Sequence, residues 1–170
     1  KWGIIGLGNV AHEFAKSFYN IKNAKLIAIA SKTQNKLSKF KDEFNINPNN
    51  CYDEYEKLLK NNEVDIIYIA LPNNFHSEWI YRSIELNKHI LVEKPAFINF
   101  KDAQKTEKYL KNLNKKFECV MLMDVLEHTD SFLKLFKIAL NKSSKYVVVG
   151  LPNEDYIIAR LRFLFGKGIL

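Results

Sequence analysis

The sequence has little of the residue types that build special architectures. It contains two cysteines, four prolines and six glycines in 170 residues. This composition excludes a disulfide framework, a collagen-like chain and a disordered chain rich in proline and glycine. Cys51 and Cys119 are too few for a four-cysteine metal site, and we expect both to be reduced and buried. No metal site is predicted.

Long apolar runs and blocks of like charge are also absent. No apolar run reaches the roughly 18 residues that a membrane helix needs, and the sequence opens directly on a predicted strand. We therefore expect a cytoplasmic protein without a membrane partner. The net charge of +7 comes mostly from lysines interleaved with acidic residues, whereas nucleic-acid binding needs clustered positive charge. No nucleic-acid partner is expected.

Apolar runs alternate with amphipathic segments of helical period, which is typical of βαβ units. The pattern predicts an α/β fold, a Rossmann-type doubly wound parallel sheet. Strands are predicted at Trp2–Gly6, Leu26–Ser31, Asp65–Ala70, Ile90–Glu93, Glu118–Met123 and Tyr146–Gly150. Helices are predicted at about Val10–Asn20, Asn35–Phe44, Asp53–Lys60, His76–Leu86, Phe100–Asn112, Ser131–Leu140 and Glu154–Phe165.

A glycine-rich loop follows the first predicted strand and opens a helix, as the G-x-G-x-x-G/A fingerprint of dinucleotide-binding proteins requires. Its residues are Gly6, Leu7, Gly8, Asn9, Val10 and Ala11. Glycines allow a tight turn and a close approach of a pyrophosphate, whose charge the amino end of the helix attracts. The loop therefore predicts a dinucleotide site, and the alternative is an ordinary turn between strand and helix.

The end of the second predicted strand lacks the acidic residue that would bind a ribose 2′-hydroxyl. Ser31 and Lys32 stand there instead. A hydroxyl followed by a cation suits a 2′-phosphate, so NADP is favoured over NAD as the cofactor. The alternative is that Lys32 is an ordinary solvated lysine.

Two further segments lie just beyond predicted strands, at the edge of the sheet where ligands bind. They read "LPNNFH" from Leu71 to His76 and "EKP" from Glu93 to Pro95. Together with the glycine loop, residues 2–117 resemble the N-terminal domain of the glucose-fructose oxidoreductase and inositol 2-dehydrogenase family, Gfo/Idh/MocA.

That resemblance implies site residues and a function. Leu71, Pro72 and Asn73 would line the cofactor, and Glu93 and Lys94 would lie at its nicotinamide end, with Lys94 as the catalytic lysine. We also count His76 among the cofactor-binding residues, although a role in packing or at the helix start is the simpler interpretation. Members of the family oxidise or reduce a sugar, polyol or related hydroxyl compound by hydride transfer.

Residues 118–170 fit this family poorly, because only about 53 residues remain where its members have a substrate domain of about 200. Asp124 and His128 have the spacing of the family's Asp-x-x-x-His pair, which a deleted oxidoreductase could retain. However, "DVLEH" and the later "LPN" resemble the second half of a class I S-adenosylmethionine-dependent methyltransferase. We expect this second segment to extend the same sheet in a βαβα arrangement.

The sequence therefore predicts a dinucleotide-binding domain at residues 1–117 and a methyltransferase-like segment at residues 118–170. A small sugar-like substrate is expected only if a substrate domain is supplied. The last predicted helix carries more apolar surface than one packed face requires, which predicts a partner chain, a missing domain or self-association as a homo-oligomer. The alternatives are a methyltransferase-related protein and a catalytically inactive nucleotide-binding module.

Overall fold

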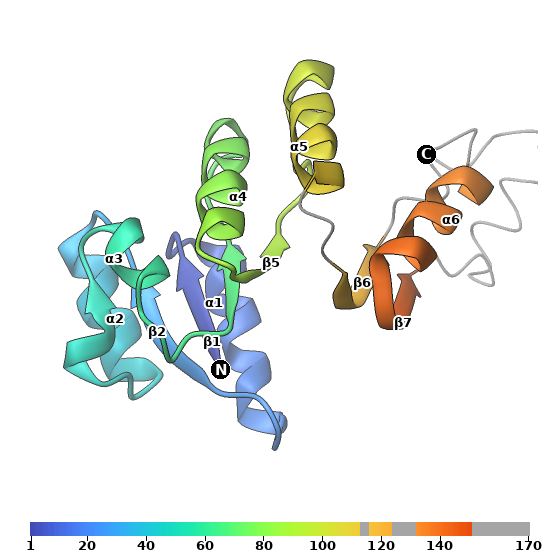
Figure 1. Cartoon of the computed structure of the whole chain (residues 1–170). Coiled ribbons are helices and arrows are strands. Elements are labelled where there is room, and N and C mark those ends of the chain that lie inside the picture. Colours follow the sequence, from blue (N-terminus) through green and yellow to red (C-terminus); the bar gives the residue numbers. More distant parts are fainter. Residues whose placement is uncertain (113–115, 124–131, 151–170) are drawn as a thin grey trace, which may run out of the picture. The chain divides into compact units, whose positions relative to one another are not determined.

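The computed structural model describes residues 1–112, 116–123 and 132–150. They belong to two compact units, Lys1–Lys108 and the described part of Tyr109–Leu170. In the first unit, strands and helices alternate along the chain (Figure 1). The elements are β1 Trp2–Ile5, α1 Asn9–Lys16, η1 Ser17–Asn20, β2 Leu26–Ala30, α2 Gln34–Glu43, η2 Pro48–Asn50, β3 Cys51–Tyr52, α3 Tyr55–Leu59, β4 Ile66–Ile69, η3 Asn73–Phe75, α4 His76–Glu85, β5 His89–Val92 and α5 Phe100–Asn112.

The five strands of the first unit form one parallel sheet in the order β3-β2-β1-β4-β5. β1 lies in the middle, where Ile5 pairs with Ala30 of β2 on one side and with Ile69 of β4 on the other. The strand order reverses between β1 and β4. In doubly wound sheets, ligands bind outside the carboxyl ends of the strands at such a switch point.

Helices cover both faces of this sheet because buried side chains alternate along the strands. On one face, Ile4, Ile29 and Tyr68 pack with residues of α1 and α2 such as Ala11 and Phe40. The other face carries its own cluster with α3 and α4. Its buried members are Ile5, Ala28, Ala30, Leu58, Leu59, Val64, Ile67, Ile69, Leu71, Trp79 and Ile80. The predicted Rossmann-type fold is therefore confirmed.

Two elements of the first unit differ from the sequence prediction. The helix expected to reach Asn20 is α-helical only to Lys16 and continues as the 3₁₀ turn η1. The Ser17 hydroxyl donates to the Phe14 carbonyl oxygen at 2.6 Å, a local bond that competes with α-helical geometry. Strand β3 was not predicted, because two residues show no periodicity. Within the described residues, no helix combines the length and apolar character that crossing a bilayer requires.

The described part of the second unit contains β6 Phe117–Met123, α6 Phe132–Lys142 and β7 Ser143–Gly150. β6 and β7 pair in parallel in a two-stranded sheet of their own. The prediction that they extend the first sheet stays a prediction. Cys119 is exposed and Cys51 half-buried, and both are free thiols, so the expected burial of Cys119 was wrong.

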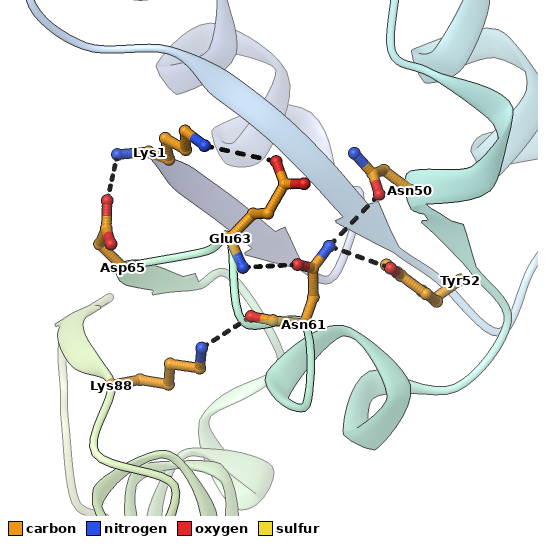
Figure 2. A network of polar contacts seen from close by, with 7 residues as sticks. All are labelled: Lys1, Asn50, Tyr52, Asn61, Glu63, Asp65 and Lys88. Atoms are coloured by element: carbon orange, nitrogen blue, oxygen red, sulfur yellow. Dashed lines mark hydrogen bonds and ion pairs between the residues drawn. The ribbon is translucent and has the colours of Figure 1, made fainter.

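A polar network holds together the turns at the amino-terminal ends of β4 and β5 (Figure 2). The Lys88 ammonium donates to the carbonyl oxygens of Asn61 and Val64, at 2.7 Å each. The Asn61 side-chain amide donates to the Tyr52 hydroxyl at 3.1 Å and to Asn50 Oδ1 at 3.3 Å. Burial lowers the pKa of Lys88. Asn61 and Lys88 precede β4 and β5, at the edge opposite the predicted site, and the bond to the Tyr52 hydroxyl joins them to β3.

Replacing Lys88 with methionine is expected to destabilise the protein while preserving the fold. The variant keeps an unbranched chain but leaves two carbonyl oxygens without their donor, which costs about 1–3 kcal/mol. The free energy of unfolding in urea measures this loss. Lys39→Met, on an exposed position of α2, is the matched control and is expected to change it by less than about 0.5 kcal/mol. Equal stability of the two variants would contradict the role of Lys88.

Candidate functional site

Four predicted site segments follow directly from the carboxyl ends of neighbouring strands. Gly6 follows β1, Ser31 follows β2, Ala70 follows β4 and Glu93 follows β5. The register of the sheet aligns these ends, since Ile5 of β1 pairs with both neighbours and Glu93 N donates to the Ile69 carbonyl oxygen at 3.2 Å. The site is therefore one continuous edge of the sheet.

The two glycines of the loop have different functions. Gly6 has a φ of +87°, and a Cβ atom added there would lie 2.6 Å from the Ala70 carbonyl oxygen. Only glycine fits this close crossing of β1 past the end of β4. Gly8 precedes α1, and a Cβ atom added there would meet nothing within 4 Å. Gly6 is therefore required by the fold, whereas Gly8 leaves open space at the start of the helix.

The amino end of α1 suits an anion. The first N–H groups of a helix have no partner within it, and the helix dipole adds partial positive charge there. The first turn of α1 contains no acidic residue. Asn9 and Val10 are exposed at this end, whereas Leu7 is buried beneath it. Backbone donors and the space beside Gly8 therefore fit a pyrophosphate.

Ser31 and Lys32 occupy the end of β2 as predicted. The Ser31 side chain is buried, and its hydroxyl accepts the backbone N–H of Thr33 at 3.1 Å. The exposed Lys32 ammonium lies 5.7 Å from the centre of the Tyr55 ring. Burial raises the pKa of Tyr55, against a hydrogen bond from the Lys32 backbone. Lys32 is thus the cation at this end of the site, and Tyr55 is a neighbour that the sequence did not reveal.

The segment after β4 offers both buried and exposed groups. Leu71 is 8% exposed and packs in the core, whereas Pro72 and Asn73 are exposed. The Pro72 carbonyl oxygen accepts the Phe75 N–H at 2.9 Å, which forms the short turn leading into α4. Pro72 and Asn73 therefore present their surfaces at the switch point beside the glycine loop.

Glu93 and Lys94 lie immediately beyond β5. The Tyr68 hydroxyl donates a hydrogen bond to the Glu93 carboxylate. Burial, together with this bond, raises the pKa of Tyr68 well above its usual range. Lys94 is exposed, and the peptide bond between Lys94 and Pro95 is cis. The Glu93 side chain is therefore held by the sheet, and the next residue is the predicted catalytic lysine.

His76 differs from the prediction that it contacts the cofactor. Its side chain is fully buried at the start of α4. Its Nε2 atom lies 2.7 Å from the Leu71 carbonyl oxygen, and its Nδ1 atom lies 2.8 Å from that of Pro95. Both polar atoms of the ring thus face the protein backbone, so the side chain presents no polar atom to a ligand. The described residues contain no group of side chains that could hold a metal ion.

The fold and this edge define a dinucleotide-binding protein, and comparison with known proteins identifies its family. The chain belongs to the GFO_IDH_MocA oxidoreductase family with an NAD-binding Rossmann fold, whose model matches residues 1–121. The resemblance stated from the sequence motifs is therefore confirmed for this part of the chain.

Known relatives match the same part. Oxidoreductase P35 of Formosa agariphila is 31% identical over 68% of this chain and 36% of its own. D-xylose 1-dehydrogenase (NADP(+)) 2 of Haloferax volcanii is 31% identical over 55% of this chain and 28% of its own. The crystal structure of apo scyllo-inositol dehydrogenase from Lactobacillus casei has a TM-score of 0.62 and 25% identity, covering 68% and 34%. The chain spans about a third of the length of these relatives.

The methyltransferase resemblance of residues 118–170 finds no support in these comparisons. The family match continues to residue 121, past the predicted boundary at residue 117. The motif "DVLEH", with Asp124 and His128, lies outside the described residues, as does the predicted helix at Glu154–Phe165. The predicted homo-oligomer, which depends on that helix, stays a prediction.

The contrast between the two glycines gives a paired prediction. Gly6→Ala is expected to lower the free energy of unfolding by at least about 1–2 kcal/mol, because it puts a Cβ atom at positive φ and against the Ala70 carbonyl. Gly8→Ala, at the N-cap of α1, is expected to lower the free energy of unfolding by less, about 0.5 kcal/mol, and to weaken dinucleotide binding. Urea unfolding and a nucleotide fluorescence titration measure the two effects. Similar stabilities of the two variants would contradict the assignment.

Proposed function

We propose that this chain is the NADP-binding part of an oxidoreductase that transfers hydride between nicotinamide and a carbon bearing a hydroxyl group. The substrate class is a sugar, polyol or related compound. The observation that carries the proposal is the strand order, which aligns Lys32, the glycine loop and Lys94 along one edge of the sheet. The order of these groups along the edge corresponds to the order of the parts of an extended dinucleotide.

The order of the strands supports a proposed position for each part of the dinucleotide. The adenosine ribose lies over the end of β2, and the pyrophosphate lies at the glycine loop after β1. The nicotinamide ribose reaches Pro72 and Asn73 after β4, and the nicotinamide lies beside Lys94 after β5. The exposure of these side chains and the open space at Gly8 support this path.

A 2′-phosphate is favoured because the end of β2 carries a cation where NAD-specific proteins carry a carboxylate. Lys32 is exposed there, and neither Ser31 nor Thr33 adds negative charge. One relative, the D-xylose dehydrogenase of Haloferax volcanii, has NADP(+) in its name. Together these features favour NADP over NAD.

Lys94 supplies the acid and base of the reaction. When bound, the nicotinamide would accept hydride from the substrate carbon in the oxidative direction. The amine of Lys94 takes the hydroxyl proton, and the substrate is left as a carbonyl compound. In the reductive direction, the ammonium returns that proton to the oxygen. A positioned acid or base of this kind contributes about 10²- to 10⁴-fold to a rate.

Nucleotide titration tests the cofactor assignment. NADPH is expected to bind more tightly than NADH, and Lys32→Ala is expected to narrow that gap by about 1 kcal/mol, or roughly fivefold, because a charge-assisted hydrogen bond to the 2′-phosphate is lost. Fluorescence of the bound nicotinamide measures both affinities.

The matched control is Lys25→Ala, which removes the same charge just before the opposite end of β2. It is expected to leave the gap between NADPH and NADH unchanged. Equal affinities in the unmutated protein, or an identical effect of the two substitutions, would reject the 2′-phosphate site at Lys32.

A polypeptide of these 170 residues is expected to bind NADP but to oxidise sugars and polyols very slowly or not at all. Lys94 provides proton transfer, but fast turnover also requires that the reacting carbon of the substrate be held against the nicotinamide. Such positioning lowers the activation barrier by about 7–11 kcal/mol. Absorbance at 340 nm with a panel of sugars and polyols measures turnover. Robust turnover that both Lys94→Ala and His128→Ala abolish would contradict this expectation and support the deleted-oxidoreductase alternative.

A further inference from the structure

Lys94 lies between two residues that are held from opposite faces of the sheet. Glu93 accepts the Tyr68 hydroxyl, and Tyr68 belongs to the core cluster on the α1 side. The carbonyl oxygen of Pro95 lies 2.8 Å from His76 Nδ1, and His76 belongs to α4 on the other side. The backbone of the predicted catalytic residue is thus fastened immediately before and immediately after its side chain.

The His76 ring also joins two segments of the site. Its second nitrogen lies 2.7 Å from the carbonyl oxygen of Leu71, the residue before Pro72 and Asn73. One ring therefore bridges the turn after β4 and the turn after β5. Carbonyl oxygens only accept hydrogen bonds, and a neutral imidazole carries one N–H, so the neutral ring donates to one of the two carbonyl oxygens and contacts the other.

Burial makes this bridge energetically significant. The ring has no exposed surface, so water does not replace it easily. Removing a buried donor leaves its acceptor unpaired. Without the ring, the turn that carries Lys94 would lose these contacts with α4 and the Leu71 carbonyl, while the Tyr68–Glu93 bond and the bond from Glu93 N to the Ile69 carbonyl oxygen would remain.

We propose that His76 is a positioning residue that fixes the turn carrying Lys94 against the nicotinamide half of the cofactor site. The inference rests on the proposed function, since it presumes that the dinucleotide lies along this edge. His76 acts through the backbone of Leu71 and Pro95 and does not touch the cofactor. Its effect is confined to the nicotinamide end, because the glycine loop and Lys32 follow other strands.

Two ligands separate this role from a general contribution to folding. NADPH contains the nicotinamide, whereas 2′-phospho-ADP-ribose keeps the adenosine, the 2′-phosphate and the pyrophosphate but lacks the nicotinamide. Calorimetry measures the affinity of each ligand for the full 170-residue chain and its variants. Circular dichroism checks that each variant is folded.

His76→Leu removes the polar ring and its N–H donor, and His76→Gln retains a side-chain amide that can donate to one carbonyl oxygen. The Leu variant is expected to lose roughly tenfold in NADPH affinity, which corresponds to about 1.4 kcal/mol, and the Gln variant less. Both are expected to bind 2′-phospho-ADP-ribose within about twofold of the unmutated chain. His89→Gln, on an exposed position of β5, is the matched control and is expected to change neither affinity.

An equal loss of affinity for both ligands in the folded Gln variant would overturn the inference. Unchanged affinity of the folded His76 variants for NADPH would overturn it as well. The Gln variant decides the test if the Leu variant does not fold. The proposed function has its own readout in the unmutated chain. Failure of that chain to bind 2′-phospho-ADP-ribose would refute the dinucleotide site itself and, with it, the role of His76.

Discussion

The close crossing of Gly6 past the Ala70 carbonyl is the contact on which the rest of the site depends. Because Gly6 has a positive φ and no Cβ atom, β1 can end directly beside β4. The chain then turns directly into α1, so that the helix begins at the switch point of the sheet. A larger residue would force apart the two central strands, and with them the glycine loop and the segment at Pro72.

On either side of this contact, the parallel register places the other site segments in a fixed order along the carboxyl edge of the sheet. Each strand end places one short segment at the edge, and the order of the strands, not the order of the sequence, decides which segments are neighbours. Lys32 and Lys94 are 62 positions apart in the sequence and follow strands on opposite sides of β1. The polar network around Asn61 and Lys88 secures the opposite edge, which leaves the carboxyl edge for binding.

Much of this arrangement could be predicted from the sequence, because apolar runs such as Ile66–Ile69 mark buried parallel strands and the motifs follow them directly. Other features depend on tertiary contacts that periodicity does not encode. His76 stands at a helix start in the sequence, but only the fold shows that its ring is buried between two carbonyls. Similarly, the runs at Glu118–Met123 and Tyr146–Gly150 read as buried strands without revealing that they pair with each other.

The most direct test of the account is an amide NMR spectrum of the chain recorded with and without NADPH. The account predicts that chemical shifts change together after the four strand ends, at Gly8, Lys32, Asn73 and Lys94, and that Asn61 at the opposite edge stays unchanged. Changes confined to one of these segments, or concentrated around Asn61, would contradict a dinucleotide bound along the carboxyl edge of the sheet.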